Sequence, residues 1–234
     1  FVQKKSITPN DAGCLQYIED FLSQRGFINE TLTFGRVKNL WSVKRNNGPL
    51  LVFLGHVDVV PTGPENEWEH DPFSGYDDGT FINGRGTGDM KGGIACFMSA
   101  LSRIDVDNLN YSIGFLITAD EEGPSKDGTV KVVEELLQRN EKIDYCLIGE
   151  PSTLENVGDN IRIGRRGSIN IELEVLGKQG HAAYPARVDN PIHKVVPFLD
   201  KLLKEVWDEG NEHFPPTSLQ LTNITAGVGA HNVT

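Results

Sequence analysis

The stretch LVFLGHVDVVPTG, residues 51–63, decides the fold class, because it starts as a buried strand and ends in polar side chains. Residues 51–54 form a continuous apolar run, which is typical of a strand that is covered on both faces. His56 and Asp58 follow, two positions apart and therefore on the same side of an extended chain. A histidine and a carboxylate at the exit of such a strand indicate a polar site there.

Strand-like and helix-like segments alternate through the first two thirds of the chain. Strands are expected at 38–44, 50–55, 111–119 and 142–149, and helices at 8–26, 89–104 and 129–139. Thr8 can cap the first helix and Gly26 can end it. This alternation predicts an α/β fold, with a mostly parallel sheet and helices on both faces.

The pattern changes near Gly167. Apolar and polar residues alternate at 169–175 and again at 218–225, which predicts strands with one buried and one solvent-exposed face. A helix is expected between them at 192–206, where Pro197 suggests a kink or a later start. This part is therefore expected to form a second, smaller α+β domain. The expected domains are residues 1–166 and 167–234.

The overall charge of the chain restricts its partners. The chain has 234 residues and a formal net charge of −11, which argues against nucleic acid or an anionic membrane as a partner. No apolar stretch reaches the length of a membrane span, and no secretory signal opens the chain. Cys14, Cys96 and Cys146 are widely spaced and are expected to be reduced core thiols, which favours a cytoplasmic protein. Because the chain starts with Phe1 and stops at GAHNVT, it is expected to be a fragment.

Carboxylates gather where the expected strands end. They are Asp120, Glu121 and Glu122 after the third strand, Glu150 after the fourth, and Asp89 in the glycine-rich loop NGRGTGDMKGG at the mouth of a helix. Ligands of doubly wound sheets bind at the carboxyl ends of the strands, so these side chains are expected to share a crevice with His56.

So many carboxylates in one crevice require a cation, because like charges at short range favour the protonated form. Lys91 is one of few basic side chains nearby in the sequence, so a bound metal is the simpler cation. A mixed set of imidazole and carboxylate ligands suits zinc, cobalt or manganese better than calcium or magnesium.

Each of these residues also has a plainer interpretation. His56 could be a hydrogen-bonded core histidine, and Asp89 could cap a helix or a turn. Glu121 and Glu122 could be a solvated pair, and Glu150 could cap a turn. The glycine-rich loop is not a phosphate loop, because it lacks the GK[ST] ending and does not directly follow a strand. The recurrence of these residues at successive strand ends favours the functional interpretation.

The motifs GHVDVVPTG, GRGTGDMKGG, TADEEG and GEPS, in this order, resemble those of the di-zinc amidohydrolases of the aminoacylase and carboxypeptidase group. The segments GDNIRIGRRGSI and GKQGHAAYPARVDNPIHK narrow the resemblance to desuccinylases that convert N-succinyl-L,L-2,6-diaminopimelate to L,L-diaminopimelate in lysine biosynthesis. The resemblance covers essentially the whole chain. It implies a zinc-peptidase-like catalytic domain, followed by a lid and dimerisation domain.

The resemblance also implies a metal site with two Zn²⁺ ions, for which Co²⁺ can substitute. His56 and Glu150 would hold one ion, Glu122 would hold the other, and Asp89 would bridge both. Asp58 would form a hydrogen bond with the imidazole of His56 and fix its tautomer.

The remaining roles concern catalysis and substrate binding. The resemblance implies that Glu121 is the general base for a metal-activated water. His181, supplied by the lid of the second subunit of a homodimer, would stabilise the oxyanion. The substrate is a small N-acyl amino acid, and its expected contacts are Arg165, Ser168, Tyr184 and Asn232. Arg165 suits the succinyl carboxylate, although Arg166 could serve instead.

One ligand of the family pattern has no counterpart in this chain. The second zinc is completed by a histidine that would lie beyond residue 234, and the remaining histidines are in other motifs: His70, His193, His213 and His231. The chain alone is therefore expected to bind the second metal poorly and to be nearly inactive. The resemblance further implies a cis peptide bond between Asp89 and Met90.

Two alternatives remain open. The first is a sister enzyme, such as an acetylornithine deacetylase or another N-acyl amino acid amidohydrolase, with the same metals and a different acyl pocket. The second is a non-catalytic relative, against which the intact Glu121 and first-zinc ligands argue.

Overall fold

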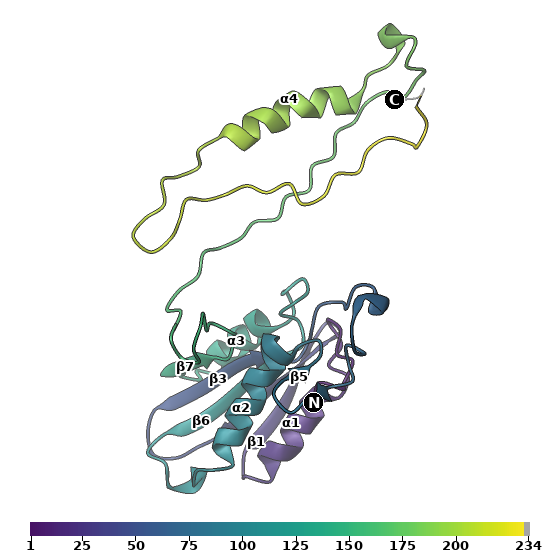
Figure 1. Ribbon diagram of the computed structural model, residues 1–234. Helices are drawn as coiled ribbons and strands as arrows, with labels where there is room; N and C mark the ends of the chain where they lie inside the picture. Colours follow the sequence, from purple (N-terminus) through teal and green to yellow (C-terminus); the bar gives the residue numbers. More distant parts are fainter. Residues whose placement is uncertain (232–234) are drawn as a thin grey trace. The chain divides into compact units, whose positions relative to one another are not determined.

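A five-stranded sheet lies at the centre of residues 1–161 in the computed structural model, which describes residues 1–231 (Figure 1). In spatial order its strands are β1 (Ile28–Phe34), β2 (Val37–Lys44), β6 (Ser112–Thr118), β3 (Leu50–His56) and β7 (Tyr145–Ile148). β2 pairs antiparallel with both of its neighbours, whereas β3 pairs in parallel with β6 and β7. Four of the five strands therefore run in one direction, and the expected α/β fold with a mostly parallel sheet is confirmed.

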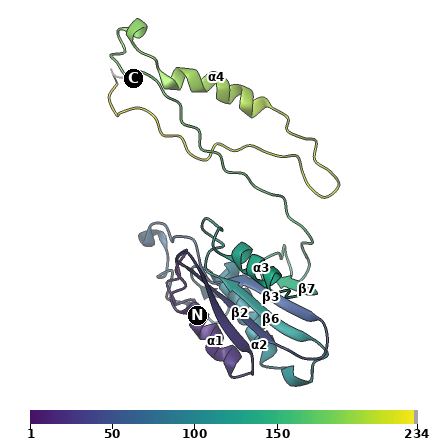
Figure 2. The same ribbon diagram turned by 180° about the vertical axis from the view of Figure 1, so that it is seen from behind.

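Helices cover both faces of this sheet. α1 (Cys14–Ser23) and α2 (Gly92–Leu101) pack on one face in a core that includes Phe53 and Phe115. α3 (Thr129–Gln138) packs on the opposite face, in a core that includes Val52 and Leu116 (Figure 2). Consecutive residues of β3 thus enter different cores, which explains why this strand is an unbroken apolar run.

The start of the first helix differs from expectation. α1 begins at Cys14, six residues after Thr8, so Thr8 is not its cap. The backbone N–H of Thr8 instead donates to the carbonyl of Val59 (3.0 Å), and Ile7 forms a parallel bridge with Val59. Tertiary pairing with the chain that leaves β3 therefore overrides the local capping pattern.

Several short elements were not expected from the sequence. β1 forms an antiparallel pair with β2 and lies at the edge of the sheet. β4 (Tyr76–Asp77) and β5 (Ile82–Asn83) form a separate two-stranded sheet. The glycine-rich loop ends in a kinked turn, Thr87–Lys91, directly before α2, in which Asp89 and Met90 have non-helical backbone angles.

The second unit, Arg162–Thr234, contains α4 (Pro191–Lys204). The side chain of Asn190 caps this helix by accepting the N–H of Ile192 (2.9 Å). Pro197 lies inside the helix, so the helix does not start after it.

The strands expected at 169–175 and 218–225 are wrong. Among the described residues, neither segment belongs to a strand, and the pairing found in this unit is a single bridge between Lys178 and Asp189. The apolar side chains of the first segment stay exposed, with Ile169 at 88% and Ile171 at 80%. An alternating pattern marks which face of a strand could be buried, but a strand also needs a partner for its backbone groups.

The cysteines are less uniform than expected. Cys14 is buried, whereas Cys96 and Cys146 are exposed, and all three are free thiols. Cys96 lies on α2 and Cys146 on β7, and the expectation of a core thiol is wrong at both positions. Within residues 1–231, none of the helices is both long and apolar enough to cross a membrane.

Candidate metal centre

The functional side chains come from the ends of neighbouring parallel strands. His56, the last residue of β3, pairs in register with Thr118, the last residue of β6. Glu121 therefore follows three residues beyond β6 at the same edge of the sheet. Glu150 lies two residues beyond β7, the other parallel neighbour of β3. Parallel pairing thus brings residues that are far apart in the sequence to one edge.

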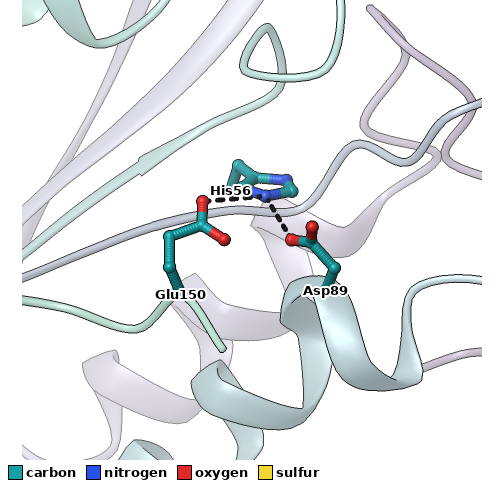
Figure 3. A group of neighbouring side chains, drawn as sticks. All are labelled: His56, Asp89 and Glu150. Carbon is teal, nitrogen blue, oxygen red and sulfur yellow. Dashed lines mark hydrogen bonds and ion pairs between the residues drawn. The ribbon is translucent and has the colours of Figure 1, made fainter. Parts of the chain in front are cut away.

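The imidazole of His56 is the centre of this group. It is buried, and its Nε2 atom lies 3.1 Å from Oδ1 of Asp89 and 3.4 Å from Oε1 of Glu150 (Figure 3). The same nitrogen is 3.8 Å from Oε2 of Glu121. Two sets of potential ligand atoms lie within 4.8 Å of one another, namely His56, Asp89 and Glu150, and His56, Glu121 and Glu122.

The opposite ring nitrogen fixes the tautomer of His56. Nδ1 lies 2.9 Å from the backbone carbonyl of Asp58, and because a carbonyl only accepts, Nδ1 carries the proton. In the neutral ring Nε2 is then left as a lone-pair donor toward the carboxylates. The carboxylate of Asp58 is farther away, with Oδ1 at 3.6 Å from Nδ1. The orienting group is thus the main chain of Asp58 more than its side chain.

The Asp58 carboxylate has a different set of partners. It is fully buried and accepts the backbone N–H groups of Glu121 (3.1 and 3.3 Å) and Glu122 (3.1 Å). Asp58 therefore links the end of β3 to the loop that carries both glutamates.

The pKa values reflect burial of these groups and the charges of their neighbours. Burial by itself lowers the pKa of His56, but the hydrogen bonds and charge of Asp58, together with the charge of Glu150, raise it to about 9. Burial and the charge of Asp89 raise the pKa of Glu150 to about 7. The same two causes raise the pKa of Glu122 above its usual value.

This donor set fits a divalent cation. One imidazole nitrogen and four carboxylates converge, and within the described part of the chain none of these acids pairs with a lysine or an arginine. A cation seated among them would relieve the repulsion that raises the pKa values of Glu122 and Glu150. Nitrogen and carboxylate donors together are typical of zinc and related transition metals.

The approach of Asp89 to Glu150 depends on close backbone packing. A Cβ atom added to Gly93, in the first turn of α2, would collide with the carbonyl oxygen of Gly149. Glycine at position 93 thus lets the start of α2 lie directly against the residue before Glu150. The peptide bond between Asp89 and Met90 is cis, as the resemblance implied.

A strap of N-terminal residues, Lys4–Thr8, supports the site and was not recognised from the sequence. The hydroxyl of Ser6 donates to the carbonyl of Val57 (2.6 Å), and the N–H of Val59 donates to the carbonyl of Ser6 (2.9 Å). The buried ammonium group of Lys91 donates to the carbonyl of Lys4 (2.9 Å). Lys91 therefore anchors the strap and is not the counter-ion of the acidic cluster. Of the strap residues only Thr8 was considered, and it was interpreted as a helix cap.

The other expected site residues lie in the second unit, apart from the cluster in the sequence. His181 is exposed, its Nδ1 accepts the N–H of Ala183 (3.1 Å), and its ring lies 5.6 Å from that of Tyr184. Arg165 and Ser168 are exposed as well. Asn232 lies outside the described residues.

Known proteins resemble this chain in sequence and in fold. Residues 52–226 match the model of the Peptidase family M20/M25/M40. Over 99% of its length the chain is 53% identical to a succinyl-diaminopimelate desuccinylase of Marinobacter nauticus and 52% identical to one of Hydrogenovibrio crunogenus. The chain spans about 62% of the length of each of these curated relatives.

Solved structures agree on the fold. An M20 family metallo-carboxypeptidase from Sulfolobus solfataricus superposes with a TM-score of 0.66 at 20% identity, over 87% of this chain and 48% of that one. A tripeptidase from Staphylococcus aureus gives a TM-score of 0.58 at 17% identity, over 99% of this chain and 60% of that one. At this level of identity the likeness concerns the fold alone.

Proposed function

The chain belongs to the peptidase family M20/M25/M40, and from this premise we propose that it is the metal-binding part of an amide hydrolase that removes succinate from N-succinyl-L,L-2,6-diaminopimelate. The hydrolase assignment is supported by one observation: potential metal ligands come together where the parallel strands of the sheet end. They are His56, Asp89, Glu121, Glu122 and Glu150. The substrate assignment is supported by the names of the relatives that are about half identical to the chain.

The proposed ligand set uses the residues of the cluster. His56 and Glu150 would hold one Zn²⁺, Glu122 would hold a second, and Asp89 would be a ligand of both, with Co²⁺ as a possible substitute. When bound, the ions polarise the scissile carbonyl and lower the pKa of a water molecule. Asp58 holds the imidazole through its carbonyl and the two glutamates through its carboxylate, so it positions ligands from both strands.

Glu121 is the proposed general base. Its side chain is about half exposed beside His56, so its carboxylate is open to solvent. It accepts a proton from water as the water oxygen attacks the succinyl amide carbon. The C–N bond then breaks, and Glu121 returns the proton to the leaving amine. The products are succinate and L,L-diaminopimelate.

Residues outside the acidic cluster have proposed roles at the substrate. Arg165 holds the free succinyl carboxylate with its guanidinium fork, and Ser168, Tyr184 and Asn232 contact the substrate as well. His181, from the second subunit of a homodimer, donates to the oxyanion. In this proposal residues 1–166 are the catalytic domain and residues 167–234 the lid and dimerisation domain of a cytoplasmic enzyme.

The test compares acyl groups in the complete protein. Turnover of N-succinyl-diaminopimelate is measured beside N-acetylornithine and other N-acetyl amino acids, in the presence of Zn²⁺ or Co²⁺. The proposal expects hydrolysis of the succinyl amide with the highest kcat/KM. Preference for an acetyl substrate would identify a sister amidohydrolase, and absence of all hydrolysis with metal bound would identify a non-catalytic relative.

A further inference from the structure

Asp120 is a buried acid in the site region that has no part in the proposed mechanism. Only 3% of its surface is exposed, and it directly precedes Glu121. Its carboxylate accepts three backbone N–H groups, from Ser125 (3.3 Å), Lys126 (3.0 Å) and Asp127 (3.0 Å). Among the described residues no basic side chain forms an ion pair with it, so these amides are what compensates its burial.

These contacts fasten the far end of the loop at residues 121–127. The loop lies outside the helices and strands, so regular backbone hydrogen bonds do not order it. Its beginning is held by Asp58, which accepts the N–H groups of Glu121 and Glu122. Its end is held by Asp120. Two buried carboxylates thus define the course of the segment that carries both glutamates.

The interior of the loop is also closely packed. A Cβ atom added to Gly123 would lie 2.9 Å from Oδ1 of Asp120 and 2.7 Å from Oγ1 of Thr8. Ser125 adopts a left-handed conformation with φ of 54°, and its hydroxyl donates to the carbonyl of Glu121 (2.6 Å). A residue with such a φ persists where its surroundings determine it. Asp120 therefore accepts the N–H of a residue whose backbone conformation the loop would not favour without these contacts.

We infer that Asp120 is a positioning residue, which aims Glu121 and Glu122 at the Nε2 side of His56 by fastening the loop at residues 125–127. This inference rests on the proposed function, because it assigns Asp120 a role through the general base and a metal ligand. Loss of the three contacts would free the loop end, and both glutamates would then sample positions away from the imidazole. The fold itself would keep its cores, because Asp120 belongs to neither of them.

Asp159 offers a control with the same hydrogen-bond pattern, although its side chain is exposed and that of Asp120 is buried. Its carboxylate also accepts three successive backbone N–H groups, from Leu154 (3.0 Å), Glu155 (2.8 Å) and Asn156 (2.9 Å). It lies in the same unit as Asp120, and no residue of the acidic cluster lies in the loop that it organises.

The experiment titrates the 234-residue chain with Co²⁺ and follows the visible absorption of the bound ion. The parent chain is compared with Asp120→Asn, Asp120→Ala and Asp159→Asn at a temperature at which each is folded. Loss of a group that orients metal ligands costs about 10- to 100-fold in metal affinity. We expect Asp120→Asn at the lower end of this range and Asp120→Ala at the upper end, both with an altered Co²⁺ spectrum. Asp159→Asn is expected to retain the affinity and spectrum of the parent chain.

Hydrogen–deuterium exchange gives a second measurement on the same variants. The amides of residues 121–127 should exchange faster in Asp120→Asn, while those of α1 and β6 keep their protection. In the complete protein, Asp120→Asn should lower kcat with little change in KM, because Glu121 acts on the water and not on the bound substrate.

A folded Asp120→Asn chain with the Co²⁺ affinity and the spectrum of the parent would overturn the inference, even if its melting temperature were lower. If Asp120→Ala does not fold, the comparison of Asp120→Asn with Asp159→Asn decides. The proposed function would fail on a different result, namely a parent protein that binds metal but does not hydrolyse the succinyl amide. Even then, weakened Co²⁺ binding in Asp120→Asn would support the positioning role of Asp120.

Discussion

Both carboxylate oxygens of Asp58 accept the one backbone N–H of Glu121, at 3.1 and 3.3 Å, so the chain that follows β3 is tied to the chain that follows β6. The same residue accepts Nδ1 of His56 on its carbonyl. One aspartate therefore orients both the imidazole and the loop of glutamates. The parallel register of β3 and β6 makes this possible, because it brings the two strand ends to the same level.

Replacement of Asp58 should weaken metal binding more than it weakens the fold. In Asp58→Ala the carbonyl that orients His56 is retained, but the amides of Glu121 and Glu122 lose their acceptor. We expect Co²⁺ affinity to fall about 10- to 100-fold, as for other groups that orient metal ligands. Isothermal titration calorimetry of the 234-residue chain measures this affinity. Asp58→Asn keeps one acceptor oxygen, so its Co²⁺ affinity should lie between those of the parent chain and of Asp58→Ala. An unchanged affinity in Asp58→Ala would contradict the positioning role of Asp58.

Metal should stabilise the chain through His56. A ligand at 100 times its Kd stabilises the native state by about 2.7 kcal/mol, and each kcal/mol raises Tm by about 2–4 °C in a domain of this size. Thermal scans with and without Zn²⁺ should show this increase, and a chelator should reverse it. The increase should vanish in His56→Ala and persist in His213→Ala, which changes an exposed histidine outside the cluster. Equal shifts in both variants would place the metal elsewhere.

Metal affinity should rise with pH because protons compete for the ligands. The pKa of His56 is raised to about 9 and that of Glu150 to about 7 in the metal-free chain. Binding must therefore displace up to two protons below pH 7, one proton between pH 7 and 9, and neither above pH 9. Calorimetry in buffers of different ionisation enthalpy measures the protons released. An affinity for Co²⁺ that does not change between pH 6 and 8 would show that these two groups are not ligands.

Removal of the general base should separate hydrolysis from metal binding. In the complete protein, Glu121→Gln should lower kcat by about 100- to 10,000-fold, the usual contribution of general acid–base catalysis. The amide retains the size of the side chain, so metal content should stay close to that of the parent. Metal analysis and turnover of the succinyl amide are measured on the same preparation. Parent-like turnover would remove Glu121 from the mechanism.

A methyl group at position 93 should open the site. In Gly93→Ala the new Cβ meets the carbonyl of Gly149, so α2 must move away from the backbone that carries Glu150. Overpacking of this kind costs about 1–3 kcal/mol in the free energy of unfolding, and the separation of Asp89 from Glu150 should also lower Co²⁺ affinity.

Gly88→Ala is the matched control for this change. Gly88 lies in the same glycine-rich segment, and a Cβ added there meets no atom within 4 Å. Denaturant unfolding and Co²⁺ titration of both variants give the comparison. Equal losses in the two variants would mean that contact with Gly149 is not the cause.

Much of the first unit could be predicted because its signals are local. The apolar run before His56 requires a strand covered on both faces, and the alternation of strands with helices requires a mostly parallel sheet. The positions of Glu121 and Glu150 after other strands then follow, since parallel strands end at one edge. The beginning of α1 was misplaced, because Thr8 pairs with Val59 and does not cap the helix, and the strands β1, β4 and β5 were missed.

The second unit was predicted less well. The alternation at 169–175 indicated a strand, yet within the described residues these positions have no partner strand and remain exposed. The alternation of apolar and polar side chains indicates which face of a strand could be buried. A strand forms only when another segment supplies hydrogen-bond donors and acceptors for its backbone. The helix at Pro191–Lys204 has its hydrogen bonds within itself, so its prediction did not depend on a partner.

The sequence by itself indicated candidate metal ligands and predicted that His56, Glu121, Glu122 and Glu150 lie at the ends of strands, because residue type and hydrophobic period are local properties. The tertiary structure alone decided that the carbonyl of Asp58 orients His56, that Asp58 and Asp120 fasten the glutamate loop, and that the N-terminal strap supports the site. These relationships are hydrogen bonds between residues up to 87 positions apart in the sequence. Their geometry exists only once the sheet has brought those segments together.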